Sequence, residues 1–279
     1  MSEQACPMAK MEKILVATDG SSYSENAVKE AIRLAKKCTS RLFAVSVVIT
    51  NLEFEVTMPQ VVEKEEKKAL QHLESIKARA SKEGIECDIT VIHGDEPYQD
   101  IIRQAQENHV DMIIVGRHGR TGLVRLMMGS VAAKVIGHAP CNVLVVSPVA
   151  TIECKNILIA TDGSRYSETA VREAIGIAKR RNCPLTIVSV ASMDVEVEAA
   201  KGNVKNAVEL ASKEGIKTEG VTIIGKPYDA IVEAAKQKHA DLIVVGSHGR
   251  RGLERLLMGS VAERVIGHTE AGVLVVKAR

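Results

Sequence analysis

One sequence pattern occurs twice in this chain, and this internal repeat limits the fold more than any other feature. Residues 13–37 read KILVATDGSSYSENAVKEAIRLAKK, and residues 156–180 read NILIATDGSRYSETAVREAIGIAKR. A longer block that begins at Asp111 returns at Asp241 with about two positions in three identical. A length of 279 residues also favours two domains, each large enough to bury a core.

The repeat predicts the domain boundaries. We expect an N-terminal tail, a first domain and a second domain at residues 1–10, 11–149 and 154–279, respectively. The second copy is shorter, because Asp162 follows Asp19 by 143 residues whereas Gly246 follows Gly116 by only 130. The missing residues correspond to about residues 50–67 of the first copy.

Short β-branched runs alternate with helical patterns in each copy. The strands predicted in the first copy are residues 14–17, 42–49, 88–92, 112–115 and 143–146. The predicted helices are residues 24–37, 63–83, 97–108 and 130–137. This alternation is typical of βαβ units around a parallel sheet. We therefore predict an α/β fold of two tandem doubly wound domains, each an open five-stranded parallel sheet with helices on both faces.

Composition excludes several classes of partner. The formal net charge is only +2, and aromatic residues make up 2% of the chain. A dedicated nucleic-acid binder carries a larger basic excess and more aromatic side chains for base stacking. No run approaches the ~18 apolar residues of a membrane span, and residues 1–10 lack the apolar stretch of a signal peptide. We expect a cytoplasmic protein with neither a nucleic-acid nor a membrane partner.

The cysteines show no pattern of a metal or redox site. They stand at Cys6, Cys38, Cys87, Cys141, Cys154 and Cys183, with no C-x-x-C spacing and no histidine pairing. We expect scattered reduced thiols and no metal held by the protein alone.

The tetrapeptide Thr-Asp-Gly-Ser follows the first predicted strand of each copy and contains Asp19 or Asp162. Open parallel sheets bind ligands at the carboxyl ends of strands, where the strand order reverses. Asp, Gly and Ser also favour turns and helix caps, and this is the simpler interpretation of the tetrapeptide. The alternative is a carboxylate that accepts a sugar hydroxyl or holds a metal.

The motif G-x2-G-x9-G-S follows the fourth predicted strand. It comprises Gly116, Gly119, Gly129 and Ser130, and returns as Gly246, Gly249, Gly259 and Ser260. Glycines after a strand let backbone N–H groups approach an anion, and a helix that begins at the final Gly-Ser favours phosphate. The intervening arginines that could offset phosphate charge are Arg120, Arg125, Arg250 and Arg255. The alternative is a turn and a helix cap, with Ser260 and Glu263 as a capping box. Two copies of the full spacing favour phosphate binding.

These motifs resemble those of the universal stress protein family, in the branch that binds nucleotides through G-x2-G-x9-G-[S/T]. The resemblance covers nearly the whole chain, twice, and includes the ATDGS segment. It implies an adenine nucleotide alpha hydrolase-like fold that binds ATP, or AMP or ADP. It also implies that Mg²⁺ arrives with the nucleotide, near Asp19 or Asp162.

The resemblance also implies roles for particular residues. In the first copy, the residues that would surround the nucleotide are Ala17, Asp19, Val47, Gly116, Arg117, His118, Gly119, Gly129, Ser130 and Val131. In the second copy they are Ala160, Asp162, Val190, Gly246, Ser247, His248, Gly249, Gly259, Ser260 and Val261. Two departures distinguish the copies, since Ser247 replaces Arg117 and Arg251 replaces Thr121. The two sites therefore need not have equal affinity.

Four histidines fall into two groups. His118 and His248 lie inside the glycine motif, and we expect them to contact the ligand. His138 and His268 follow the last predicted helix of each copy, where an imidazole can cap backbone carbonyls. We assign no catalytic residue.

The motifs favour a binding module over an enzyme. Neither the G-x4-G-K-[S/T] phosphate loop nor the S-G-G-x-D-S signature of ATP pyrophosphatases occurs in the sequence. The leading hypothesis is a tandem universal stress protein that binds ATP and regulates a stress response through an unknown protein partner. The alternatives are a slow ATPase or nucleotide-transfer enzyme, and an interaction scaffold that needs no nucleotide.

The last strand of each copy is expected to be paired. Family resemblance implies pairing through this strand, an edge that is costly to leave bare. Residues 142–146 and 272–276 can then pair within one chain as a pseudo-dimer, and two chains can associate further into a homodimer.

Overall fold

The computed structural model describes residues 6–8, 11–119, 128–249 and 258–278. The strands of the first half are β1 (Lys13–Ala17), β2 (Arg41–Ile49), β3 (Cys87–Gly94), β4 (Met112–Gly116) and β5 (Asn142–Val146). Those of the second half are β6 (Ile157–Ala160), β7 (Leu185–Ala191), β8 (Thr218–Ile224), β9 (Leu242–Gly246) and β10 (Gly272–Val276). The helices of the first half are α1 (Ser22–Cys38), α2 (Leu52–Thr57), α3 (Pro59–Lys82), α4 (Pro97–Glu107) and α5 (Ser130–His138). The second half contains α6 (Arg165–Arg181), η2 (Asp194–Glu196), α7 (Val197–Lys213), α8 (Pro227–Gln237) and α9 (Ser260–His268).

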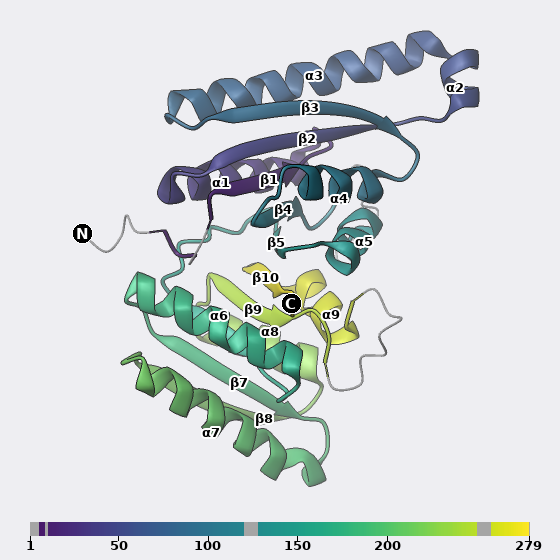
Figure 1. The fold of residues 1–279 in the computed structure, drawn as a ribbon. Coiled ribbons are helices and arrows are strands. Elements are labelled where there is room, and N and C mark those ends of the chain that lie inside the picture. Colours follow the sequence, from purple (N-terminus) through teal and green to yellow (C-terminus); the bar gives the residue numbers. More distant parts are fainter. Residues whose placement is uncertain (1–5, 9–10, 120–127, 250–257, 279) are drawn as a thin grey trace.

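All ten strands form one sheet in the order β3-β2-β1-β4-β5-β10-β9-β6-β7-β8. Neighbouring strands are parallel within each half, whereas β5 and β10 are antiparallel, with Leu144 opposite Leu274. The α/β prediction of two tandem five-stranded parallel sheets is confirmed. The predicted pairing of the last strands joins the two halves at the centre of the molecule (Figure 1).

Helices cover both faces of the sheet, and each face has its own core. Ala31 of α1, Leu73 of α3 and Ala174 of α6 are fully buried on one face. Val135 of α5 and Val265 of α9 are fully buried on the other. Both cores continue from one half into the other, because alternate residues of β5 and β10 point to opposite faces.

The extra residues of the first half form a helical insertion. They build α2, which the sequence patterns did not predict, and lengthen α3 to 24 residues, against 17 in α7. The Asn51 side chain caps α2 by accepting a hydrogen bond from the Phe54 N–H at 2.8 Å. In Figure 1 the insertion lies at the outer end of the first half, far from the β5–β10 junction.

A disulfide joins Cys6 to Cys38 and ties the N-terminal tail to the end of α1. The expectation that all cysteines are reduced is therefore wrong for this pair. The two cysteines are 32 residues apart and form no recognised sequence motif, so the sequence did not predict their pairing. The folded tail brings the two sulfurs together. The expectation agrees with the structure for Cys87, Cys154 and Cys183, which form no disulfide. Burial raises the pKa of Cys87 to about 11 and that of Cys154 to about 12.

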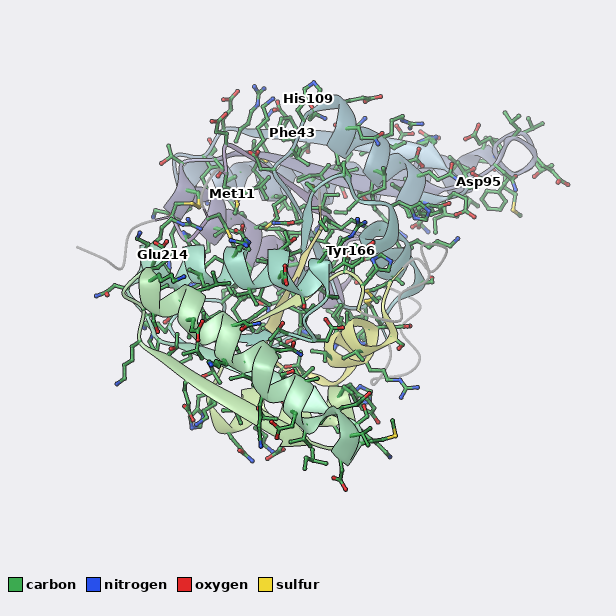
Figure 2. The ribbon with its side chains drawn as sticks, turned by 60° about the horizontal axis from the view of Figure 1, so that its bottom comes forward. Met11, Phe43, Asp95, His109, Tyr166 and Glu214 are labelled. Atoms are coloured by element: carbon green, nitrogen blue, oxygen red, sulfur yellow. A yellow bond between two sulfur atoms is a disulfide. The ribbon has the colours of Figure 1, made fainter. Side chains whose placement is uncertain are left out.

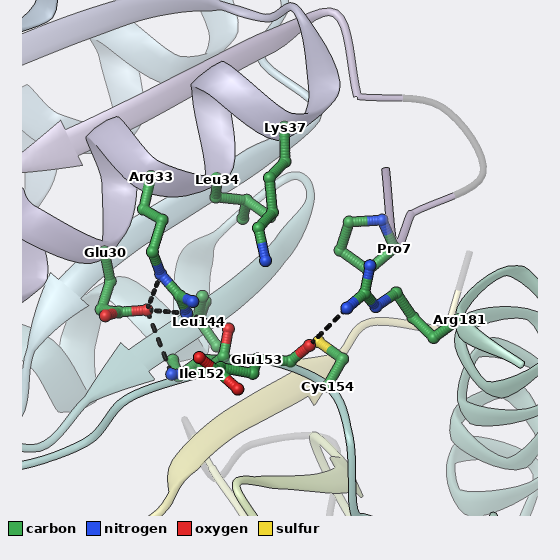
Figure 3. Close-up of a pocket in the computed structure, with 10 residues that line it drawn as sticks. All are labelled: Pro7, Glu30, Arg33, Leu34, Lys37, Leu144, Ile152, Glu153, Cys154 and Arg181. Atoms are coloured by element: carbon green, nitrogen blue, oxygen red, sulfur yellow. Dashed lines mark hydrogen bonds and ion pairs between the residues drawn. The ribbon is translucent and has the colours of Figure 1, made fainter. Parts of the chain in front are cut away.

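The segment between the two halves packs against α1 (Figure 3). The Glu30 carboxylate accepts hydrogen bonds from the Arg33 guanidinium and from the Ile152 N–H, while Arg33 also donates to the Ile152 carbonyl. Arg181 of α6 donates to the Glu153 carbonyl at 3.1 Å. The cavity between these groups holds only about 10 Å³. It lies along the second half of α1, toward the amino ends of the strands and away from the glycine motifs.

None of the helices in the described ranges combines the length and the apolar character that a membrane crossing requires.

Candidate functional site

The two motifs of each half lie side by side at the carboxyl edge of the sheet. Strand β1 has β2 on one side and β4 on the other, so the strand order reverses between β1 and β4. The Thr-Asp-Gly-Ser turn follows β1, and the glycine motif follows β4. Strands β6 and β9 repeat this arrangement in the second half.

The second glycine of each motif lies against the aspartate of the other motif. A Cβ placed on Gly119 would be 2.8 Å from Asp19 Oδ2, and one on Gly249 would be 2.7 Å from Asp162 Oδ2. A side chain at either glycine would force the carboxylate to move. The fold therefore brings together the two motifs that the sequence separates by about a hundred residues.

The first glycine of each motif has a packing role. A Cβ on Gly116 would lie 3.2 Å from the Tyr23 carbonyl oxygen, and one on Gly246 would lie 2.8 Å from the carbonyl carbon of Tyr166. Tyr166, labelled in Figure 2, belongs to the first turn of α6. Contact with the adjoining helix accounts for both glycines without a ligand.

The third glycine begins the last helix of each half. Gly129 and Gly259 are the N-caps of α5 and α9, and neither cap has a side-chain hydrogen bond. The Gly129 N–H donates to the Arg117 carbonyl at 2.9 Å, and the Gly259 N–H donates to the Ser247 carbonyl at 2.9 Å. The following N–H groups lack acceptors within their own helix, as in any first turn.

The capping box considered for Ser260 and Glu263 is therefore wrong. Ser260 lies inside α9, and Gly259 takes the cap position. Ser130 and Ser260 are both exposed, as are Val131 and Val261 beside them. The first turns of α5 and α9 thus face solvent at the carboxyl edge of the sheet.

The first aspartate sits in a dense hydrogen-bond network. Asp19 Oδ1 accepts from the Ser21 N–H at 3.0 Å, from the Ser21 hydroxyl at 2.7 Å and from the Ser24 hydroxyl at 2.8 Å. Ser24 also lies 2.9 Å from the Thr18 hydroxyl, which lies 3.1 Å from His72 Nε2. The tetrapeptide was predicted to form a turn and a helix cap. The Ser21 N–H to Asp19 bond closes the turn, and Ser21 stands at the N-cap of α1 without a side-chain cap hydrogen bond. His72 gave no sequence signal, because its position on a charged helix resembles any solvated residue.

The second aspartate has a related arrangement. Asp162 Oδ1 accepts from the Ser164 N–H at 3.0 Å. The Ser164 hydroxyl caps α6 by accepting from the Ser167 N–H at 3.3 Å, whereas the Ser21 hydroxyl donates to Asp19 instead. Equivalent serines therefore stabilise different elements in the two halves.

The residues expected on the adenine side lie near the ends of inner strands. Ala17 and Val47 stand in β1 and β2, and Ala160 and Val190 stand in β6 and β7. All four are partly buried and pack on the core face that also holds α5 and α9. They therefore share one face and one edge of the sheet with the candidate phosphate helices.

Arg117 reaches across the domain interface. Its Nη1 donates to the carbonyls of Gly267 at 3.2 Å and Thr269 at 2.7 Å, at the end of α9. Its Nε donates to Nε2 of His118 at 3.1 Å. Burial lowers the pKa of Arg117. The side chain predicted to contact phosphate is thus engaged with the opposite half.

The two motif histidines pack against tyrosines of the adjoining helix. His118 is 8% exposed, and burial, followed by the charge of Arg117, lowers its pKa. Its ring meets Tyr23 edge to face. His248 Nδ1 lies 3.1 Å from the Ser247 hydroxyl, and the ring centroid lies 5.0 Å from that of Tyr166. These contacts account for both histidines within the fold.

The histidines at the ends of the last helices cap carbonyls as predicted. His138 Nδ1 lies 2.8 Å from the Lys134 carbonyl oxygen, and His268 Nδ1 lies 2.7 Å from that of Arg264. The arginines proposed to offset phosphate charge, and the Thr121-to-Arg251 replacement, lie outside the described residues. Within the described ranges, no group of three or more His, Cys, Asp or Glu side chains is arranged to hold a metal ion.

Comparison with known proteins places both halves in one family. The universal stress protein family model matches residues 10–147 and residues 153–277. The chain belongs to the universal stress protein family.

Two relatives show how this universal stress protein compares with curated members. A universal stress protein of Methanocaldococcus jannaschii is 38% identical over 139 residues, which cover 44% of this chain and 82% of that protein. One from Mycobacterium tuberculosis is 33% identical over 188 residues, which cover 61% of this chain and 63% of that protein. A solved universal stress protein of Archaeoglobus fulgidus has the same fold, with a TM-score of 0.78 and 21% identity over 96% of this chain and 99% of that one.

Proposed function

We propose that this universal stress protein binds ATP, or ADP or AMP, with Mg²⁺ at one or both glycine motifs and regulates a stress response through its nucleotide state. The supporting observation is the placement of two glycine-capped helix N-termini at the points where the strand order reverses. Such an N-terminus offers unpaired N–H groups and a favourable dipole to phosphate.

The surrounding groups fit a nucleotide. The hydroxyls of Ser130 and Ser260 adjoin the helix N-termini and can donate to phosphate. Asp19 and Asp162 lie against the middle glycine, where a carboxylate can accept a ribose hydroxyl or approach the Mg²⁺ that a nucleotide carries. The alanine and valine at the ends of the inner strands in each half supply an apolar face for adenine.

The burial and hydrogen bonding of His118 favour binding over catalysis. A general base needs access to the proton it removes. The His118 ring is buried and accepts a hydrogen bond from Arg117, so it is poorly placed to act on a nucleotide. The proposal is therefore a nucleotide-dependent binding module, read by a protein partner, and not an ATPase.

Calorimetry with ATP and Mg²⁺ tests this function in four proteins: the wild type, Gly129→Ala, Gly259→Ala and the double variant. A Cβ at Gly129 or Gly259 would approach no heavy atom closer than 3.4 Å, so alanine fits the fold while covering the phosphate approach. We expect each single variant to lose the binding heat of its own half and the double variant to lose both.

The matched control is Gly202→Ala in α7, where nothing lies within 4 Å of an added Cβ. This variant is expected to bind nucleotide as the wild type does. Absence of heat from the wild type, or equal binding by the wild type and the double variant, would remove the proposed function.

A further inference from the structure

The two candidate phosphate helices each receive a cation from the opposite half at their C-terminal end. Arg117 of the first half donates to carbonyls at the end of α9, at distances of 2.7 Å to Thr269 and 3.2 Å to Gly267. Lys277 of the second half donates to carbonyls at the end of α5, at distances of 2.9 Å to Ile136 and 3.0 Å to Gly137. Cations at this end of a helix satisfy its last carbonyls and complement its dipole.

The two cations come from different positions of the repeat. The counterpart of Arg117 is Ser247, and the counterpart of Lys277 is Ser147. The Arg117 N–H bonds the carbonyl of Val146, the residue before Ser147, and the Ser247 N–H bonds the carbonyl of Val276, the residue before Lys277. The two positions therefore adjoin one another in each half, and each half supplies one cation and one serine. In the first half the cation follows β4, and in the second half it follows β10. In both halves it bonds the C-terminal end of the opposite helix.

Both cations are partly withdrawn from water. Burial lowers the pKa of Arg117 and that of Lys277. Removing a charge from water is costly unless partners compensate it, and the carbonyls of the opposite helix are these partners. The contact is thus a defined feature of the junction between the halves.

The backbone at or next to each of these residues is also hydrogen-bonded to the glycine motif of its own half. The Arg117 carbonyl accepts the hydrogen bond of Gly129, the N-cap of α5. Lys277 follows Val276, whose carbonyl bonds Ser247, and the Ser247 carbonyl in turn accepts the hydrogen bond of Gly259. Each helix has nine residues and is therefore about 13 Å long. Backbone hydrogen bonds together with the side chain of Arg117 or Lys277 therefore connect the N-terminus of one helix to the C-terminal end of the other.

We propose that Arg117 and Lys277 couple the two nucleotide sites, so that nucleotide at one site strengthens binding at the other. Phosphate at Gly129 holds this residue and its hydrogen bond to the Arg117 carbonyl in place, and the Arg117 side chain in turn holds the end of α9, the helix whose N-terminus forms the second site. The reverse path runs from Gly259 through Lys277 to α5. Coupling between two binding sites is reciprocal, and a factor of about five or more is expected in each direction. This inference rests on the proposed function and requires that both sites bind nucleotide.

The first arm of the test needs no nucleotide. Arg117→Ser copies Ser247, and Lys277→Ser copies Ser147, so each variant introduces the residue that the other half carries. Hydrogen exchange measured by mass spectrometry is expected to quicken at the end of α9 in Arg117→Ser and at the end of α5 in Lys277→Ser. Unchanged exchange at both helix ends would overturn the contact and the coupling with it.

The second arm measures ATP affinity at each site with the other site intact or blocked. Blocking the first site with Gly129→Ala is expected to weaken the second about five-fold or more in the wild-type background. The same block is expected to have no effect in Arg117→Ser. The double variant Arg117→Ser with Ser147→Lys copies the second half, and we expect it to restore both slow exchange and coupling.

The outcomes separate the two proposals. Nucleotide binding at only one site, or at both sites with affinities that do not depend on each other, would overturn the coupling and leave the proposed function standing. Absence of nucleotide binding at both sites would overturn both.

Discussion

The two glycine motifs make the same backbone hydrogen bonds at their described ends but use their side chains differently. In the first, Arg117 spans the junction to α9, and its neighbour Ser147 donates to the Glu270 carbonyl at 2.6 Å. In the second, Ser247 is 1% exposed, and Lys277 spans the junction instead. The two copies therefore keep the same contact, a cation on the carbonyls that end the opposite helix. The residue that makes this contact follows β4 in one copy and β10 in the other.

The two halves also differ at the end of their first helix and in the helices that cover their outer strands. Among the described residues, α2 and the longer α3 belong to the first half, and so does the Cys6–Cys38 disulfide. The second half cannot form this disulfide because the counterpart of Cys38 is Arg181. Arg181 bonds the Glu153 carbonyl in the segment between the halves. One position of the repeat therefore serves a covalent link in one half and a polar contact in the other.

The largest expected effect concerns the first glycine of each motif. Gly246→Ala would place a Cβ 2.8 Å from backbone atoms of Tyr166, which cannot move without displacing α6. We expect a loss of about 3 kcal/mol in the free energy of unfolding, measured in denaturant. Gly116→Ala, with its closest contact at 3.2 Å, is expected to lose less. Equal losses would contradict the packing difference between the two loops.

The next effect concerns the disulfide. Reduction of Cys6–Cys38 frees a loop closed over a separation of 32 residues, and we expect the unfolding free energy of the first half to fall by about 2 to 3 kcal/mol. Thermal unfolding of the wild type and of Cys6→Ser, each with and without dithiothreitol, measures it. Cys6→Ser is expected to show no response to the reductant. A large response in that variant would mean that another thiol contact is responsible.

A smaller effect separates the two Thr-Asp-Gly-Ser turns. Ser164→Ala removes the side-chain cap of α6 and is expected to cost about 1 kcal/mol in thermal or denaturant unfolding. In Ser21→Ala no side-chain cap of α1 is lost, and the change removes the 2.7 Å hydrogen bond to Asp19 instead. Hydrogen exchange is therefore expected to quicken at the start of α6 in Ser164→Ala and to stay unchanged at the start of α1 in Ser21→Ala. The reverse pattern would refute the assignment.

The smallest expected effect is a pH dependence. The pKa of buried His118 lies below its ordinary value of 6.5. Just below pH 6.5 the unfolded chain therefore binds a proton at this histidine more readily than the folded chain does. The unfolding free energy contributed by this group is present above pH 6.5 and falls as the pH drops below that value. We expect His118→Gln to show a shallower decline than the wild type in denaturant titrations between about pH 6.5 and 5. Identical slopes would contradict the burial of the neutral ring.

Periodicity and the repeat were enough to predict the strands and the sheet class, and the family resemblance implied the pairing of β5 with β10. They also placed the glycine motifs at the carboxyl edge, because a parallel sheet gathers its strand ends there. Three features lay beyond the sequence. The sequence places Arg117 beside the nucleotide, whereas in the structure the antiparallel junction brings α9 close enough for Arg117 to bond its carbonyls. Cys6 pairs with Cys38 because the folded tail brings it to the end of α1. Gly116 and Gly246 have no room for a side chain because the adjoining helix packs against them.

The most direct test of the central claim is a count of the nucleotide that the purified protein carries. The protein is denatured, the released nucleotide is identified by mass, and its amount per chain is measured for the wild type and for the variants Gly129→Ala and Gly259→Ala. We predict ATP, ADP or AMP at about one or two per chain, with each variant losing the share of its own half. A wild-type protein that releases no nucleotide and also refuses added ATP would contradict the account and reduce the glycine motifs to turn and packing geometry.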